Sequence, residues 1–585
     1  MRNAKIVCTL GPATNTESAI RNLADAGMSV ARLNASHGTL EDRRTLIERV
    51  RTVDESTTSP VAVMLDTKGP EIRTAPLPTG ETVTLESDGE VLFVEGEEAR
   101  PDRVGLSMAI NGVESGDYIL LDDGLIETRV TEVDDNGIHA TVETGGVLGG
   151  RKGVNVPGVD LDLDIVTEAD RRDLELAAET GVDFVAASFV RDADDVYEVS
   201  ETLESFGADI PIISKIERAG AVANLESIID ASDGVMVARG DLGVECPMED
   251  VPMIQKRIIR KSREAGRPVI TATEMLDSMV TSRRPTRAEA SDVANAVLDG
   301  TDAVMLSAET AVGDHPTVVV ETMNSIIRQV EGSDEYATLL EQRVPEAGDA
   351  RTDALARSAR YLARDIGADA IVAATESGFT ARKTAKYRPG VPVVASTQSH
   401  TVRRQLALSW GVQPLFAQVS DQGADAVVSR AVQSALDAGV AESGDTVVVL
   451  CGMMTELEGA STTNMLKVHV AAEVVATGRV VVDGRATGPL VHVRDGDLTT
   501  VPEGAIIALA EDFDAEFVGD VGKIAGIIDA RPGMTGYPAL VARETNVPMV
   551  SDADVGDLSA DQTVTIDGER GVVYEGNVDD RRSRE

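Results

Sequence analysis

Short, nearly continuous apolar runs alternate with longer stretches of helix-like periodicity through the first 335 residues. Runs rich in Val, Ile and Ala are typical of strands in a parallel sheet that is buried on both faces. Eight such units, each followed by a helical segment, predict an α/β fold whose sheet closes into a (β/α)8 barrel. The runs are KIVCTL (5–10), SVARLNAS (29–36), VAVMLDT (61–67), DFVAASFV (183–190), PIISKIE (211–217), GVMVARGD (234–241), PVITATE (268–274) and DAVMLSAE (302–309).

The pattern changes three times along the chain. Residues 70–154 alternate apolar and polar positions and are rich in Gly and Asp, as in ETVTLESDGEVLFV, which predicts a small all-β insertion in a loop of the barrel. A second α/β pattern occupies 336–475, and a third occupies 476–585. The barrel is therefore assigned to 1–69 and 155–335. A division into four domains is consistent with the length of 585 residues, because a single hydrophobic core rarely extends beyond ~250–300 residues.

Cysteine use and the length of apolar runs favour a reducing compartment. Cys8, Cys246 and Cys451 are far apart and form no CxxC pair, so neither a disulfide framework nor a zinc site is expected. The segment MRNAKIVCTLG has an apolar run too short for a signal peptide. No apolar run reaches the ~18 residues of a membrane span. A cytoplasmic protein without a membrane partner is expected.

Net charge is the most unusual feature of the composition. With 99 acidic residues against 54 Lys and Arg, the chain has a formal charge of -45. Carboxylates spread over the whole length are typical of a halophilic protein, because molar salt screens like-charge repulsion beyond ~3 Å. An ordinary acidic enzyme is the alternative. In either case a basic face is not expected, which argues against a nucleic-acid partner.

Polar residues cluster at the carboxyl ends of the predicted strands, where barrel enzymes have their active sites. Several lie two positions apart, which directs their side chains to one face of an extended strand. Each group should therefore project together into the mouth of the barrel. The groups are Arg32, Asn34 and Ser36; Lys215 and Glu217; and Arg239 and Asp241.

Two of these groups suggest a site for a divalent cation beside a lysine. Lys215 ends an apolar run, and a buried lysine without a partner is costly. Glu217 and Asp241 come from adjacent predicted strands and could hold Mg²⁺, which typically takes one or two carboxylates and completes its shell with water and phosphates. The alternatives are a structural ion pair between Lys215 and Glu217 and unrelated salt bridges of the two carboxylates.

A second, oxygen-rich set suits a monovalent ion because it contains a single acidic residue. It consists of Asn34, Ser36, Asp66 and Thr67. Simple hydrogen bonding at the strand ends is the alternative explanation. Three cations in this anionic chain, Arg32, Arg73 and Lys152, are candidates for holding phosphates, and arginine can bind two oxygens at once. Their alternative role is in surface salt bridges.

Taken together, these segments resemble the pyruvate kinase family over roughly residues 1–475. The longest motifs, LDTKGPEIR and RPTRAEASDVANAV, are far more specific than a lone glycine motif. The remaining segments that match in family order are KIVCTLGPAT, ARLNASHG, RKGVNVPG, SKIE, DGVMVARGDLG and TATEMLDSM. The resemblance implies transfer of a phosphoryl group from phosphoenolpyruvate to ADP, giving pyruvate and ATP in the last step of glycolysis.

The resemblance also assigns roles at the matching positions. Lys215 would stabilise the phosphoryl group in transfer. Glu217 and Asp241 would bind Mg²⁺ or Mn²⁺. The K⁺ ligands would be Asn34, Ser36, Asp66 and the Thr67 carbonyl.

Substrate positions follow from the same resemblance. Arg32 would bind the substrate phosphate, with Lys215 and Asp241 beside it. Gly240 and Thr273 would seat the carboxylate, and Thr273 would take part in the proton relay. The insertion 70–154 would close over the site as a lid and exclude water. ADP would be bound by Asn34, Ala35, Ser36, His37, Arg73 and Lys152.

Three positions near these sites bear on the comparison with the family. Glu71 is the residue that accompanies potassium dependence in this family, whereas a lysine there replaces the ion, so potassium dependence is predicted. Ala35 stands where an aromatic residue is usual, which we interpret as a packing change below the potassium ligands. Glu274 replaces a more usual glutamine and adds negative charge near the carboxylate site. None of these differences removes a catalytic group.

The C-terminal parts resemble two further domains. Residues 336–475 resemble the family's regulatory domain, in which Thr375, Ser377 and Thr380 could bind a phosphorylated allosteric effector at a helix start. Helix capping is the alternative, and Glu376 would repel a phosphate. Residues 476–585 resemble the swivelling mobile domain of phosphoenolpyruvate-utilising enzymes, but Tyr537 stands where that domain has its phosphohistidine. A structural or regulatory appendage is expected, and the family implies a homotetramer.

Three other functions compete with that of a pyruvate kinase. A metal-dependent aldolase would share the Glu217–Asp241 pair but has no use for the phosphate-binding cations, the lid or the potassium ligands. A phosphoenolpyruvate synthase-like carrier needs the missing histidine and a nucleotide-binding domain that no segment supplies. An inactive regulatory subunit would have no reason to keep Arg32, Lys215 and Thr273. ADP-dependent formation of pyruvate distinguishes a pyruvate kinase from all three.

Overall fold

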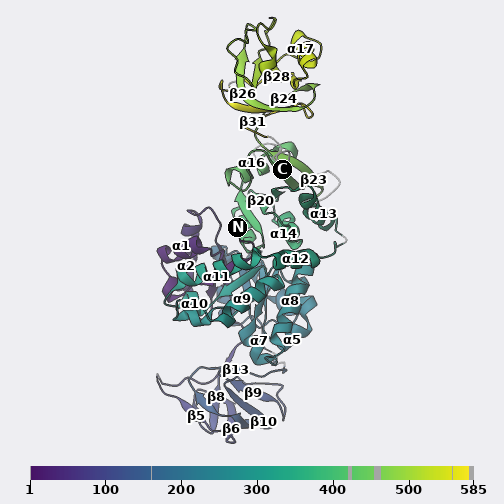
Figure 1. Ribbon diagram of the computed structural model, residues 1–585. Helices are drawn as coiled ribbons and strands as arrows, with labels where there is room; N and C mark the ends of the chain where they lie inside the picture. The colour runs from purple at the N-terminus through teal and green to yellow at the C-terminus, as the bar shows by residue number, and fades with distance from the viewer. Residues whose placement is uncertain are drawn as a thin grey trace. The chain divides into compact units, whose positions relative to one another are not determined.

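The computed structural model describes residues 2–578, apart from 79, 160, 162, 349, 419–423, 453–462 and 557. The chain divides into two compact units, whose elements are labelled in Figure 1. The first unit comprises Met1–Ala347, Ala385–Arg388 and Ser399–Pro414. The second comprises Gly348–Thr384, Pro389–Gln398 and Leu415–Glu585.

Eight parallel strands of the first unit close into a barrel in the order β1-β18-β17-β16-β15-β14-β3-β2. The prediction of a (β/α)8 barrel from eight apolar runs is confirmed, because each run contains one of these strands. The strands are β1 Lys5–Thr9, β2 Val30–Asn34, β3 Ala62–Asp66, β14 Phe184–Ala187, β15 Ile212–Ile216, β16 Gly234–Ala238, β17 Val269–Ala272 and β18 Ala303–Leu306.

Helices follow the strands and lie outside the barrel. Several begin at a threonine whose hydroxyl accepts a backbone N–H of the first turn, as Thr39 and Thr167 do before α2 and α3, which satisfies amide groups that a helix start leaves unpaired. The main helices of this layer are α1 Glu17–Ala26, α2 Leu40–Asp54, α3 Glu168–Thr180, α4 Ala193–Ser205, α6 Leu225–Ala231, α8 Val251–Ala265, α9 Arg287–Asp299 and α11 Pro316–Glu331.

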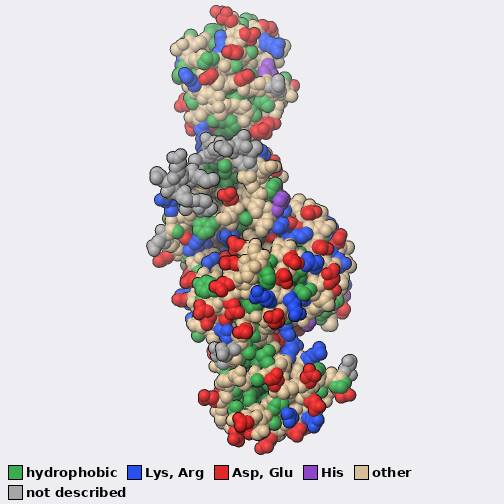
Figure 2. Space-filling model, turned by 180° about the vertical axis from the view of Figure 1, so that it is seen from behind, with side chains coloured by type: hydrophobic (Ala, Val, Ile, Leu, Met, Phe, Trp, Pro, Cys, Tyr) green, Lys and Arg blue, Asp and Glu red, His purple; other side chains and the backbone are tan. Residues whose placement is uncertain are grey.

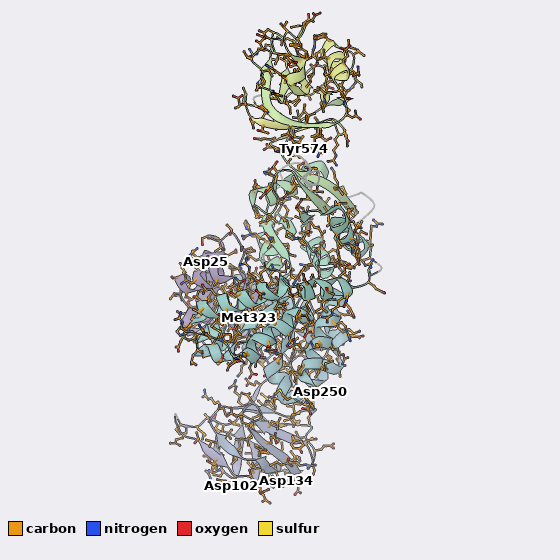
Figure 3. The ribbon with its side chains drawn as sticks, viewed as in Figure 1. Asp25, Asp102, Asp134, Asp250, Met323 and Tyr574 are labelled. Atoms are coloured by element: carbon orange, nitrogen blue, oxygen red, sulfur yellow. The ribbon has the colours of Figure 1, made fainter. Side chains whose placement is uncertain are left out.

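Successive residues of a barrel strand serve two cores. Along β1, Val7 packs in a cluster inside the barrel, whereas Ile6 and Cys8 pack in the layer between strands and helices. Met323 of α11, labelled in Figure 3, is fully buried in that outer layer. Met64 of β3 belongs to the inner cluster. Aliphatic side chains and methionine thus form both cores of a chain in which only 3% of residues are aromatic.

The segment between β3 and α3 forms the predicted all-β insertion. Its strands make an eight-stranded sheet in the order β4-β13-β9-β10-β11-β6-β8-β7 and a separate pair of β12 and β5. Asp102 and Asp134, labelled in Figure 3, are exposed residues of this part. The strands are β4 Ile72–Arg73, β5 Val83–Leu85, β6 Glu90–Glu95, β7 Ala99–Arg100, β8 Arg103–Leu106, β9 Tyr118–Leu121, β10 Ile126–Asp134, β11 Gly137–Thr144, β12 Gly146–Leu148 and β13 Gly153–Asn155.

The C-terminal parts have a sheet each. A five-stranded sheet runs β21-β20-β19-β22-β23, and an eight-stranded sheet runs β24-β31-β30-β26-β27-β28-β29-β25. The first sheet has β19 Ala370–Ala374, β20 Val393–Thr397, β21 Val412–Phe416, β22 Asp445–Cys451 and β23 Met465–Ala471, with α13 Arg351–Ile366, α14 Phe379–Lys386 and α16 Ala424–Asp437. The second has β24 Val474–Thr477, β25 Arg479–Val482, β26 Arg485–Val493, β27 Ala505–Leu509, β28 Ile524–Asp529, β29 Met549–Ser551, β30 Thr563–Asp567 and β31 Val572–Glu575, with α17 Tyr537–Thr545.

The described surface carries many carboxylates. Figure 2 shows Asp and Glu side chains spread over the face in view, interspersed with Lys and Arg, as expected from 99 acidic and 54 basic residues. Among the residues that the structure describes, no helix combines the length and the apolar character needed to cross a membrane.

Candidate active site

Lys215 lies at the centre of a buried polar cluster at the carboxyl end of β15. Its ammonium is 2.7 Å from the Ser188 hydroxyl, 2.9 Å from Glu217 Oε1 and 3.4 Å from Asp66 Oδ1. Burial alone would lower the pKa of Lys215, but the carboxylates of Asp66 and Glu217 outweigh it and raise that pKa above its usual value. Lys215 therefore stays protonated near neutral pH. The ion pair with Glu217, expected as an alternative, is formed within this cluster.

Glu217 is the carboxylate of this cluster that needs a further partner. It is 1% exposed; its Oε1 lies 2.9 Å from the Lys215 ammonium, whereas its Oε2 has no hydrogen-bond partner among the described atoms. Burial raises the pKa of Glu217 to about 7 with help from the like charge of Asp241, and Lys215 opposes the shift. Buried carboxylate oxygens without donors are the ligands that a hard cation prefers. Glu217 and Asp241 therefore fit a divalent ion.

The reasoning that placed Arg239 and Asp241 on one face of a strand is wrong. Strand β16 ends at Ala238, and both residues lie in the short helix α7 (Arg239–Glu245). The Arg239 guanidinium donates to the carbonyls of Ala272 and Thr273 and pairs with Asp292 at 2.7 Å. The sequence GVMVARGD concealed this change because its apolar run continues to the point where the helix begins.

The oxygen-rich set comes from two neighbouring strands. Asn34 of β2 and Asp66 of β3 are register partners, so both strands end together. The Asn34 amide oxygen accepts the Ser36 backbone N–H at 3.0 Å, and the Thr67 carbonyl accepts the Ser188 hydroxyl at 2.7 Å. These bonds leave lone pairs on each oxygen. The set fits a weakly charged ion, and the hydrogen bonding expected as the alternative is also present.

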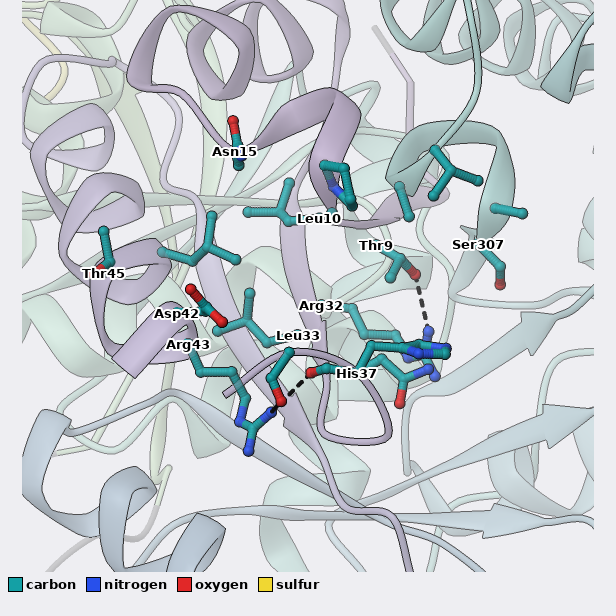
Figure 4. A pocket seen from close by; sticks show the side chains of 18 of the residues that line it. Thr9, Leu10, Asn15, Arg32, Leu33, His37, Asp42, Arg43, Thr45 and Ser307 are labelled. Atoms are coloured by element: carbon teal, nitrogen blue, oxygen red, sulfur yellow. Dashed lines mark hydrogen bonds between the residues drawn. The ribbon is translucent and has the colours of Figure 1, made fainter. Parts of the chain in front are cut away.

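Arg32 binds Asp66, the carboxylate that belongs to both the Lys215 cluster and the oxygen-rich set. Its Nε lies 2.5 Å from Asp66 Oδ2, and its NH1 donates to the Thr9 hydroxyl at 3.0 Å (Figure 4). Although burial opposes ionisation, Arg32 and Lys215 hold the pKa of Asp66 below its usual range. The single acid of the oxygen-rich set is therefore ionised.

A cavity of about 870 Å³ opens beside Arg32. Of the residues predicted to bind the nucleotide, Asn34 and His37 line this cavity. Its lining does not include Ala35, Ser36, Arg73 or Lys152. Figure 4 shows its wall, which combines apolar side chains with polar groups from β1, β2 and α2. A space of this size, lined by both apolar and polar side chains, suits an organic ligand with an anionic end near Arg32.

Sequence reasoning missed Ser188 and Thr9. Ser188 bridges the Lys215 ammonium and the Thr67 carbonyl, and Thr9 accepts from Arg32. Both lie within apolar runs, DFVAASFV and KIVCTL, where the strands β14 and β1 end, and a hydroxyl at the carboxyl end of a barrel strand was the available signal.

Thr273 directly follows β17, Gly240 lies in α7, which follows β16, and the two residues meet. The Gly240 N–H donates to the Thr273 hydroxyl at 2.8 Å, and that hydroxyl donates to the Ala272 carbonyl at 2.6 Å. Thr273 and Glu274 both have positive φ, 67° and 54°, which is unfavourable for side chains with a Cβ. The contacts of Arg239 with the Ala272 and Thr273 carbonyls hold this turn in place.

The predicted phosphate-binding cations of the insertion have acidic partners. Arg73 pairs with Glu71 at 2.8 Å and donates to the Arg151 carbonyl, and Lys152 pairs with Asp122 at 2.8 Å. Arg73 lies on β4 opposite Gly153, next to Lys152, so the two cations come from adjacent strands. Both cations thus form the salt bridges that were expected as the alternative. A bound phosphate would have to replace these carboxylate partners.

In the second unit, the proposed effector residues precede and begin α14. Thr375 is buried, Ser377 is exposed, and the Thr380 hydroxyl bonds that of Thr463 at 2.8 Å. In the last part, the Tyr537 hydroxyl at the start of α17 accepts the Phe517 N–H at 3.1 Å. A phenol held in this way has no imidazole nitrogen to carry a phosphoryl group.

Comparisons with known proteins identify the parts of the chain. Residues 1–320 match the model of the pyruvate kinase barrel domain, 353–469 that of the pyruvate kinase alpha/beta domain, and 501–571 that of the mobile domain of PEP-utilising enzymes. Two proteins named pyruvate kinase, from the MRSA252 and USA300 strains of Staphylococcus aureus, are each 42% identical over 584 residues. The match covers 98% of this chain and 99% of each relative.

Proposed function

Because the chain belongs to the pyruvate kinase family and is a phosphotransferase, we propose that Lys215 and its neighbours transfer the phosphoryl group of phosphoenolpyruvate to ADP. The supporting observation is the Lys215 ammonium, kept charged by Asp66 and Glu217 at the carboxyl end of the barrel. A fixed cation stabilises the negative charge that spreads over the phosphoryl oxygens during transfer.

The hydrogen bonds of the site residues support the substrate positions. Arg32 binds the substrate phosphate from a guanidinium already oriented by Asp66 and Thr9. Gly240 and Thr273, which are joined by the hydrogen bond from the Gly240 N–H to the Thr273 hydroxyl, seat the carboxylate. Once the phosphoryl group leaves, the enolate of pyruvate takes up a proton at its terminal carbon, and the Thr273 hydroxyl lies in the relay that delivers it.

Metal ions complete the charge balance. Glu217 and Asp241 hold Mg²⁺ or Mn²⁺, and the buried Glu217 Oε2, which has no partner among the described atoms, supports this assignment. When bound, the divalent ion supplies positive charge to the substrate oxygens. Asn34, Ser36, Asp66 and the Thr67 carbonyl hold K⁺, which Glu71 in place of a lysine also favours.

The nucleotide occupies the cavity next to Arg32. Asn34, Ala35, Ser36 and His37 bind ADP or ATP from the loop after β2, and Arg73 and Lys152 approach from the insertion. Residues 70–154 act as the lid that excludes water from the transfer. Pyruvate and ATP leave when the lid opens.

The remaining assignments concern organisation and regulation. The barrel comprises 1–69 and 155–335, the regulatory domain 336–475, and the mobile-like domain 476–585. The enzyme is a cytoplasmic homotetramer, and a phosphorylated effector binds near Thr375, Ser377 and Thr380. Adaptation to high salt stays a prediction from the charge of -45.

Replacing Lys215 by Met tests the proposal most directly. In a coupled assay for ADP-dependent pyruvate formation at high KCl, we expect Lys215→Met to lower kcat by at least about 10³-fold, because it removes the charge that faces the transition state. The control is Lys261→Met, which removes a surface lysine paired with Glu226 at 2.8 Å and should keep full activity. Unchanged turnover in Lys215→Met would overturn the mechanism.

A further inference from the structure

The loop between β2 and α2 depends on one buried arginine. Arg43, in the second turn of α2, is 7% exposed. Its NH1 is 2.9 Å from the His37 carbonyl oxygen, 3.4 Å from that of Gly38 and 3.5 Å from that of Ala35 (Figure 4). One guanidinium nitrogen thus lies within 3.5 Å of three carbonyl oxygens of the loop 35–39, and the bond to His37 is the shortest.

The other end of the guanidinium is fixed by helix α3. Arg43 NH2 lies 2.8 Å from Oδ1 of Asp173, which is 3% exposed. A buried carboxylate is costly unless a positive charge compensates it, so this pair strongly favours one position of the arginine. Asp173 therefore determines where Arg43 holds the loop.

The same helix also holds the loop after β3. Asp170, one turn before Asp173, accepts the backbone N–H groups of Lys68 at 2.9 Å and Gly69 at 3.0 Å. Residues three apart lie on one face of a helix. One face of α3 thus supports both loops that supply the proposed potassium oxygens and the nucleotide residues.

We propose that Arg43, anchored by Asp173, is a positioning residue that holds the loop 35–38 in the geometry required for K⁺ and ADP. This inference rests on the proposed function of that loop. Arg43 also borders the cavity, so direct contact with the nucleotide is the competing explanation. The two differ in what they require of Asp173: positioning needs its carboxylate, whereas direct contact does not.

The test compares Arg43→Met, Asp173→Asn and the double variant in the full-length enzyme. For Arg43→Met we expect the KM for ADP and the half-activating K⁺ concentration to rise about tenfold, because a displaced loop weakens both ligands. The KM for phosphoenolpyruvate, and kcat at saturating ADP and K⁺, should stay within about twofold. Asp173→Asn should shift the same two constants, and the double variant should be no worse than Arg43→Met, since both act on one contact.

Two further variants control for the loss of any arginine from this helix and for misfolding. Arg44→Met removes the neighbouring arginine, which pairs with Glu179 of α3 at the surface, and should change neither constant. Arg43→Lys keeps a charge opposite Asp173 and so preserves folding, but a single ammonium cannot span both loop and carboxylate, and it should also raise both constants.

Unchanged constants in Arg43→Lys and Arg43→Met would overturn the inference. So would an equal effect of Arg44→Met, or a normal Asp173→Asn beside an impaired Arg43→Met, which would indicate direct contact. Failure of the proposed function is distinguishable, because the unmodified enzyme would then show no ADP-dependent pyruvate formation.

Discussion

Two lysines at opposite ends of the barrel show how the same side chain acquires opposite properties. Lys215 ends β15 among two carboxylates, and its pKa is raised. Lys5 begins β1, and its ammonium donates to the Val412 carbonyl at 2.7 Å. Burial there lowers the pKa of Lys5 to about 7, assisted by Arg2 and only partly opposed by Glu331 and Asp302. Contact with a carboxylate, rather than depth, decides whether a buried lysine stays charged.

The contrast between the two lysines agrees with the different roles of the two ends of the barrel in barrel enzymes. Carboxyl ends of strands carry the chemistry, and amino ends contribute stability. Changes at the carboxyl end should therefore alter turnover, whereas changes at the amino end should alter the free energy of unfolding and leave turnover intact.

Replacing potassium by sodium acts at the carboxyl end and should have a large effect on turnover. Without K⁺, the oxygens around Asp66 lack the ion they fit, and we expect kcat/KM for phosphoenolpyruvate to fall at least about tenfold. The measurement is the coupled assay in potassium-free NaCl at matched ionic strength, with KCl as control. Equal activity in both salts would contradict the potassium assignment.

Lys5→Met should change the pH dependence of stability. Because the folded pKa of Lys5 is lowered to about 7, the folded chain releases this proton above that pH, while the unfolded chain keeps it until its pKa of 10.5. Lys5 should therefore increase the free energy of unfolding as the pH rises above 7. This contribution should disappear as the pH falls through 7.

In the variant this rise should be smaller by about 3 kcal/mol between pH 7 and 9.5, as urea unfolding at several pH values would show. Its kcat should equal that of the unmodified enzyme. An identical pH slope in both proteins would mean that Lys5 is charged when folded, and the contrast with Lys215 would fail.

Deleting residues 476–585 should have the smallest effect on chemistry. The last domain presents a tyrosine hydroxyl, bonded to the Phe517 N–H, where a phosphate carrier would need a histidine. We expect kcat within about twofold of the full chain when the truncated protein is folded by circular dichroism. Complete loss of activity in a folded truncation would give this domain a part in catalysis.

The barrel was predictable because its signal is repeated eight times along the chain. Each apolar run had to be buried on both faces, and the register of β2 with β3 then brought Asn34 and Asp66 together. The site was predictable as groups of residues, but their mutual contacts were not. No sequence pattern could show that Ser188 bridges Lys215 and Thr67, because these residues lie on three different strand ends.

Errors arose where one type of element changes into another. The run that includes β16 reads as a strand through Asp241, yet β16 ends at Ala238 and a helix begins at Arg239. The role of Arg43 was not predicted for a different reason. Its helix is polar in sequence and indicates a solvent-exposed arginine, whereas in the structure Asp173, from a segment far away in the sequence, pairs with it.

Closure of the barrel has a consequence for synthesis of the chain. Strand β1 pairs with β18, so residues 5–8 meet their partners only after residue 306 has been made. At ~5–20 residues per second the ribosome needs roughly 15 to 60 s to reach that point. During this time the apolar first strand has one edge without its final neighbour.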